Sequence, residues 1–109
     1  MRIELLVIEN CPNSALAAER LGAALEALGV RNTPILQHVL KTSAETLGTG
    51  FAGSPTIIAG GIDLFPAATT RELACRIYPT PDGLQGAPTV DQLTAALSAR
   101  GYGQRQANR

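Results

Sequence analysis

Residues 7–14 read Val-Ile-Glu-Asn-Cys-Pro-Asn-Ser, a stretch in which an aliphatic run ends and a cysteine follows. In the run over residues 3–8, only Glu4 is polar, which is typical of a strand buried on both faces. Pro12 has the fixed φ angle and the missing N–H that suit the first position of a helix. The stretch therefore predicts a central parallel strand, a turn and a helix, with Cys11 at or beside the N-cap.

A thiol at the beginning of a helix has a specific chemistry. Unpaired N–H groups and the positive end of the helix dipole stabilise a thiolate, which lowers the pKa of the thiol. Cys11 is therefore a candidate nucleophile, and the alternative is an inert, half-buried cysteine. Ser14 is a candidate hydrogen-bond donor to the thiolate, although serine is also common in a first helical turn for capping reasons.

Length and composition predict one domain with an ordinary hydrophobic core. The chain has 109 residues, of which 45% are hydrophobic and 17% are charged. Nine basic residues balance nine acidic ones, so no net charge favours nucleic acid or an anionic membrane. The N-terminus begins a strand and shows no signal-peptide pattern, so we expect a cytoplasmic protein. Two cysteines are too few for a disulfide framework.

The residues after Cys11 predict a βαβ unit, a short helix and a β-hairpin. Apolar residues at helical spacing indicate a helix over residues 12–28, and an apolar run indicates a strand over 35–40. Thr42 and Glu45 have the spacing of a capping box. Strands over 57–59 and 62–64, joined by a Gly-Gly turn, predict the hairpin. We expect the sheet order second, first, third, fourth strand, with the third antiparallel to the first.

The C-terminal part is predicted to be a long loop, a closing helix and a tail. Residues 66–88 contain several prolines and glycines, which indicates an irregular segment with one helical turn over 72–76. Thr89 and Gln92 indicate a capping box before the closing helix, which is expected to stop at Gly101. Residues 1–101 are therefore predicted to form the domain, and 102–109 a polar tail.

This order of elements resembles the thioredoxin-like fold, an α/β architecture of βαβ-α-ββα order with a four-stranded mixed sheet flanked by helices. The stretch Cys11-Pro12-Asn13-Ser14 looks like the Cys-Pro-x-Ser variant of the glutaredoxin active site, and Ser54-Pro55 is similar to the dipeptide that holds the family's cis-proline. The further stretches Asp-x-Phe-Pro, Ala-Cys-Arg-x-Tyr and Thr-Pro-Asp-Gly-Leu resemble a small bacterial group of thioredoxin-like proteins, sometimes labelled alkylmercury lyase-like.

The resemblance implies roles for residues of both motifs. Cys11 would be the catalytic nucleophile, and a substrate would be held by four residues: Pro12, Ser54, Pro55 and Thr56. In a dithiol enzyme of the family, the fourth position of the motif is the resolving cysteine. In this sequence that position is occupied by Ser14. Cys11 must therefore act as a monothiol or pair with Cys75, which the expected topology places on a loop leaving the sheet on the active-site side. A disulfide between them requires Cα atoms about 4.4–6.8 Å apart.

Three classes of function follow. The first is a monothiol thioredoxin-like or glutaredoxin-like thiol–disulfide oxidoreductase without a cofactor, whose partner is a small thiol or a protein disulfide. The second is a protein that binds mercury or copper(I) through Cys11 and Cys75, with Asp63 as proton donor if it cleaves a carbon–mercury bond. The third is a non-catalytic binding module of the same fold. Arg71 and Arg76 flank Cys75 and are candidates for binding an anionic substrate, but arginines on a loop usually face water.

Overall fold

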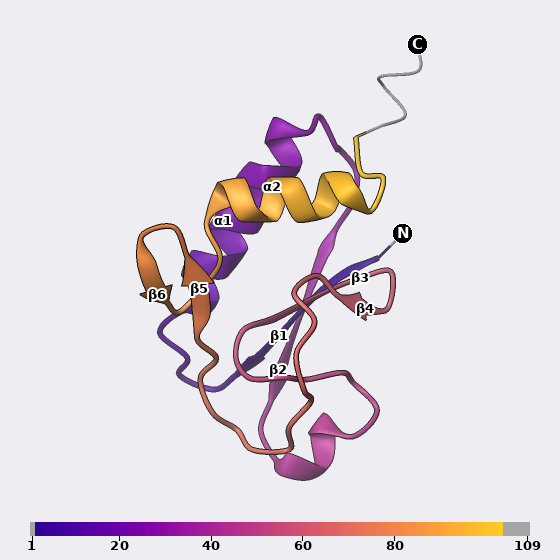
Figure 1. Ribbon diagram of the computed structural model, residues 1–109. Helices are drawn as coiled ribbons and strands as arrows, with labels where there is room; N and C mark the ends of the chain where they lie inside the picture. The colour runs from indigo at the N-terminus through magenta and orange to yellow at the C-terminus, as the bar shows by residue number, and fades with distance from the viewer. Residues whose placement is uncertain (1, 104–109) are drawn as a thin grey trace.

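The structure, a computed structural model, describes residues 2–103 and has a mixed α/β architecture with two α-helices (Figure 1). The elements follow in the order β1 (Ile3–Ile8), α1 (Ser14–Ala27), β2 (Ile35–Leu40), the 3₁₀ helix η1 (Ser43–Thr46), β3 (Thr56–Ala59), β4 (Ile62–Asp63), β5 (Tyr78–Thr80), β6 (Gly83–Gln85) and α2 (Val90–Ala99). The predicted βαβ unit and the first hairpin are therefore confirmed.

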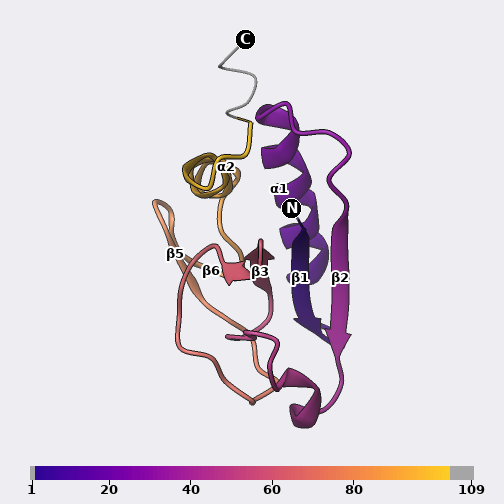
Figure 2. The ribbon, with the colours of Figure 1, turned by 90° about the vertical axis from the view of Figure 1, so that its right-hand side faces the viewer.

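The main sheet is mixed and has the predicted order β2-β1-β3-β4. Strands β1 and β2 are parallel neighbours in register from Ile3 opposite Ile35 to Ile8 opposite Leu40 (Figure 2). Strand β3 runs antiparallel to β1, with Leu6 opposite Thr56. Because the register places the beginning of β3 near the end of β1, the residues just before Thr56 lie beside the chain that leaves Ile8.

One face of the sheet packs against both helices and forms the main core. Alternate residues of β1 and β3 point to this face, as the period of a strand requires. Apolar residues of α1 and α2 meet them there. The buried members of this cluster are Ile3, Leu5, Val7, Ala17, Leu21, Ala24, Leu25, Ile57, Ala59, Leu64, Ala87, Leu93, Leu97 and Tyr102. Burial of apolar surface is worth about 25 cal/mol per Å², so this cluster favours folding.

The other face of the sheet carries a smaller cluster and is covered by loops. Leu6 and Ile58 point to this side, where they pack with Leu40 and Phe51. Leu73, from the long segment after β4, packs against the same cluster. The segment that contains Cys75 is therefore held on the helix-free face by apolar packing as well as by hydrogen bonds.

The first helix begins two residues later than predicted. Its N-cap is Asn13, whose carbonyl accepts the first helical hydrogen bond, from Ala17 N at 2.9 Å. Pro12 is not at the first helical position; it lies in a preceding turn closed by a hydrogen bond from Ser14 N to Cys11 O (3.3 Å). The fixed φ of proline suits such a turn as well as a helix, which is why the sequence pattern did not separate them.

The capping predictions had different outcomes. Thr42 caps η1 by accepting a hydrogen bond from Glu45 N, but the Glu45 carboxylate accepts from Lys41 N instead of completing the box. The box of Thr89 and Gln92 at the beginning of α2 is complete.

The prediction for residues 66–88 was wrong in two respects. Residues 72–76 form no helical turn, because Cys75 pairs as a single β-bridge with Ser54. A second hairpin, β5–β6, follows and brings Thr80 opposite Gly83. The sequence Pro81-Asp82-Gly83 is a recognised turn signal, so this hairpin was visible in the sequence and was missed.

The C-terminus of the packed domain lies beyond residue 101. Tyr102 is buried in the main core, and burial raises the pKa of its hydroxyl above the ordinary value. Residues 104–109 of the predicted tail lie outside the described residues. Within residues 2–103, no helix combines the length and the apolar character needed to cross a membrane.

Two glycines with nearly the same φ test how closely the Cys75 segment packs. A Cβ at Gly53 (φ +107°) would lie 2.8 Å from Arg76 Cβ, whereas one at Gly83 (φ +103°) would meet nothing within 4 Å. Gly83→Ala is expected to cost about 1–2 kcal/mol through backbone strain alone. Gly53→Ala is expected to cost about 1–3 kcal/mol more, because the two segments must separate.

Urea unfolding of both variants measures this difference. Equal losses of stability in Gly53→Ala and Gly83→Ala would contradict the close packing of residues 53 and 76.

Candidate functional site

A tight turn places Cys11 at the end of β1. The turn is closed by a hydrogen bond from Cys11 N to Ile8 O (3.3 Å), and Asn10 within it has a φ of +58°. Asparagine tolerates this left-handed conformation better than most residues because its side chain can hydrogen-bond locally. Glu9 and Asn10 are exposed, whereas Cys11 is half-buried.

The Cys11 sulfur lies among hydrogen-bond donors. Burial by itself raises the pKa of the thiol, but hydrogen bonds from the Ser54 hydroxyl, the Asn13 N–H and the hydroxyl and N–H of Ser14 outweigh it. The net result is a pKa below the ordinary value of a cysteine. Because α1 has no side-chain N-cap, the N–H groups at its beginning are available to the sulfur. Ser14 is therefore brought to Cys11, as the sequence predicted.

Ser54 joins three segments of the chain. Its side chain is fully buried, and its Oγ accepts a hydrogen bond from Ile8 N (3.1 Å) while the hydroxyl donates to Cys11. Its backbone N–H donates to Ala74 O (2.9 Å), and its carbonyl accepts from Arg76 N (2.8 Å). The Ser54–Pro55 peptide bond is cis, as the motif predicted.

Pro55 and Thr56 support this loop from within the protein. Both side chains are fully buried. The Thr56 hydroxyl donates to Gly53 O and accepts from Ala52 N (3.0 Å), and Pro55 O accepts a hydrogen bond from the Tyr78 hydroxyl. Of the four predicted substrate-holding residues, only Pro12 is exposed. The buried three can shape the site, but their side chains do not form its surface.

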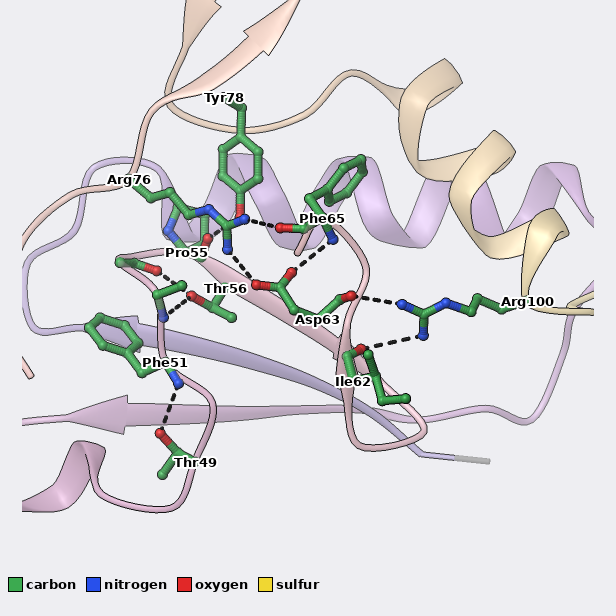
Figure 3. A network of polar contacts seen from close by, with 12 residues as sticks. Thr49, Phe51, Pro55, Thr56, Ile62, Asp63, Phe65, Arg76, Tyr78 and Arg100 are labelled. Carbon is green, nitrogen blue, oxygen red and sulfur yellow. Dashed lines mark hydrogen bonds and ion pairs between the residues drawn. The ribbon is translucent and has the colours of Figure 1, made fainter. Parts of the chain in front are cut away.

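A polar network behind Pro55 holds the segment that contains Cys75 (Figure 3). Arg76 is only 9% exposed; it forms an ion pair with Asp63 at 2.8 Å and donates to Phe65 O. Its guanidinium also lies 4.5 Å from the centre of the Tyr78 ring, within cation–π range. Burial raises the pKa of the Tyr78 hydroxyl, which keeps it a donor to Pro55 O. The prediction that Arg76 faces water was therefore wrong.

Asp63 has a structural role in this network. One carboxylate oxygen accepts from Arg76 and the other from Phe65 N (2.8 Å). Both carboxylate oxygens are therefore engaged inside the protein, where they hold Arg76 and the beginning of the segment after β4.

Cys75 is exposed and lies next to the site. It is paired through the backbone with Ser54, and neither cysteine is in a disulfide. Among the described residues, no group of three or more His, Cys, Asp and Glu side chains is arranged to hold a metal ion.

A shallow pocket of about 360 Å³ opens beside Cys11 on the side of β2, away from Ser54 and Cys75. It is lined by residues from the end of β1, the beginning of α1 and strand β2, namely Val7, Ile8, Glu9, Asn10, Cys11, Ser14, Gln37 and Val39. Glu9 is the one charged residue among them. The sequence did not indicate that β2 contributes to the site, because Gln37 and Val39 belong to no motif.

Comparisons with protein-family models, with curated proteins and with solved structures find no match to this chain.

Substitution of the two serines tests the hydrogen bonds to Cys11. In a Cys75→Ala background, Ser54→Ala is expected to raise the pKa of the Cys11 thiol, because a donor to the thiolate is lost. Ser14→Ala is expected to raise it less, since its hydroxyl contributes less than that of Ser54. The pH dependence of the alkylation rate by iodoacetamide measures both values.

The intact Cys11 thiol, in the same background, should titrate below a free cysteine in an unfolded peptide of the same sequence. If neither serine substitution moves the titration upward, the hydrogen bonds do not set the reactivity.

Proposed function

We propose that this protein is a thioredoxin-like thiol–disulfide oxidoreductase of glutaredoxin type, in which Cys11 is the thiol that attacks the substrate disulfide. The observation that carries the proposal is the set of four donors around the Cys11 sulfur, two residues before the N-cap of α1 and beside the loop that contains Ser54. The sheet order supports the proposal, while the element order differs from the expected one by the additional hairpin β5–β6 before α2. The proposal places the protein in the cytoplasm, where thiols are kept reduced.

The exchange needs no cofactor. The Cys11 thiolate attacks one sulfur of a disulfide R–S–S–R′, forms a Cys11–S–S–R bond and breaks the substrate's S–S bond, which releases R′–S⁻. A small thiolate then attacks the R sulfur, forms a new disulfide with it and releases Cys11 as thiolate. The donors that lower the pKa raise the fraction of Cys11 that is ionised near neutral pH.

The pocket beside Cys11 indicates which disulfides fit. It is shallow and contains no basic residue among those that line it, so it offers no counter-charge to an anionic substrate. Many glutaredoxins have a lysine just before the active-site cysteine, whereas Glu9 and Asn10 precede Cys11 here. A neutral or cationic small disulfide is therefore the better substrate on electrostatic grounds.

Removal of the sulfur tests the central role of Cys11. Reduction of bis(2-hydroxyethyl) disulfide by the protein and a reducing thiol is expected to fall to the uncatalysed rate in Cys11→Ser, because no nucleophile remains. The control is Ser98→Ala, on α2 away from the pocket, which should keep full activity. A wild-type protein that gives no rate above background would favour the binding-module alternative.

Neutralisation of Glu9 tests the charge preference. Glu9→Gln is expected to increase the second-order rate constant of Cys11 with oxidised glutathione, an anion, by about two- to fivefold. The factor is of this size because an interaction with an exposed charge contributes up to about 1 kcal/mol. With cystamine, a cation, the rate should fall by a similar factor, and both effects should weaken at high salt. Glu26→Gln, on α1 and outside this pocket, is the matched control. A change of the same sign for both substrates would contradict an electrostatic cause.

A further inference from the structure

We infer that Cys75 is the resolving cysteine of this site, presented to Cys11 by the strand pairing of residues 74–76 with Ser54. The inference rests on the proposed exchange at Cys11 and names the group that completes it. It also gives residues 66–77 a function, as the segment that carries the second thiol to the site.

The first support is the backbone pairing. Ser54 bonds to Ala74 O and to Arg76 N, so Cys75 lies opposite Ser54, one strand spacing away at about 4.8 Å. Residues that pair in this way carry their side chains on the same face of the pair. The Ser54 hydroxyl points to the end of β1, where it accepts from Ile8 N, and the turn that carries Cys11 begins there. The Cys75 thiol therefore lies on the face of the pair that is directed to this turn.

The second support is that the backbone of the segment is fixed while the Cys75 side chain is exposed. The backbone is fixed on both sides of Cys75, because Ala74 O accepts from Ser54 N before it and Arg76 N donates to Ser54 O after it. The Arg76 side chain is in turn held by Asp63 and Phe65 O. The Cys75 side chain is nevertheless exposed. A buried cysteine is usually a small apolar core residue, and Cys75 has no such packing role.

The third support is the position of the pocket. It opens from Cys11 toward Gln37 and Val39 of β2, whereas Ser54 and Cys75 lie on the β3 side, and β1 separates β2 from β3. A thiolate displaces sulfur most readily from the side opposite the leaving group. A substrate fragment bound to Cys11 in the pocket therefore leaves the β3 side free for attack by Cys75.

The step is balanced without any further oxidant. After the first exchange, Cys11 is joined to the substrate fragment as Cys11–S–S–R. The Cys75 thiolate attacks Cys11 Sγ, the Cys11–Cys75 bond forms, the bond to the fragment breaks and R–S⁻ leaves. The substrate disulfide has then gained two electrons, and the two cysteines have been oxidised to one disulfide. Two molecules of a small thiol then reduce this disulfide: they regenerate both cysteine thiols and leave as one disulfide.

A single-turnover reaction with one equivalent of a dipyridyl disulfide tests the inference. The wild-type chain should release two thiopyridones per protein, measured by absorbance, and intact mass should show a loss of two hydrogens with no adduct. Cys75→Ala should release one and keep a pyridyl adduct, which peptide mapping should place on Cys11. The double variant Ala74→Cys, Cys75→Ala moves the thiol to the opposite face of the same segment and should also keep the adduct.

The outcomes separate the two proposals. A wild-type chain that keeps its Cys11 adduct, or forms a disulfide between two chains, overturns the role of Cys75 and leaves the monothiol exchange intact. Closure in the Ala74→Cys, Cys75→Ala variant at the wild-type rate overturns the argument from strand pairing. The absence of an adduct on Cys11 in Cys75→Ala overturns the proposed function itself.

Discussion

The hydrogen bonds of Ser54 are the interaction on which the arrangement of the site depends. This fully buried residue binds the end of β1 through Ile8 N and the Cys75 segment through its own backbone, while its hydroxyl reaches the Cys11 sulfur. A buried polar group without partners would cost about 1–3 kcal/mol. Because all of its groups are satisfied by different parts of the chain, Ser54 fixes the mutual position of segments that are far apart in the sequence.

The network around Arg76 supports the same loop from behind. A guanidinium that is only 9% exposed needs a counter-charge and hydrogen-bond acceptors, and Asp63 and Phe65 O supply them. Tyr78 contributes both its ring, below Arg76, and its hydroxyl, bonded to Pro55 O. The long segment after β4 is therefore an ordered part of the site, although its composition resembles that of a surface loop.

The sequence predicted those parts of the fold that depend on local patterns. Apolar runs located β1 and β2, the Gly-Gly turn located the hairpin of β3 and β4, and the Thr89–Gln92 spacing located α2. The sequence did not predict other features that depend on contacts between distant residues. The strand pairing of Cys75 is set by Ser54, and burial of Arg76 is set by Asp63, so neither leaves a periodic signal near residue 76. The signals that single out Cys11 and Ser14 as candidates lie in one short stretch, whereas Gln37 and Val39 line the pocket from a neighbouring strand.

The contact between the second hairpin and the beginning of α1 limits how this protein can move. A Cβ at Gly86 would lie 2.2 Å from the Asn13 side chain, which would have to turn aside. Arg20 of α1 donates to Gln85 Oε1, Ala87 O and Pro88 O. A displacement of the hairpin must therefore break these hydrogen bonds or carry α1 with it. The opposite rim of the pocket is formed by β2, an edge strand with one neighbour in the sheet.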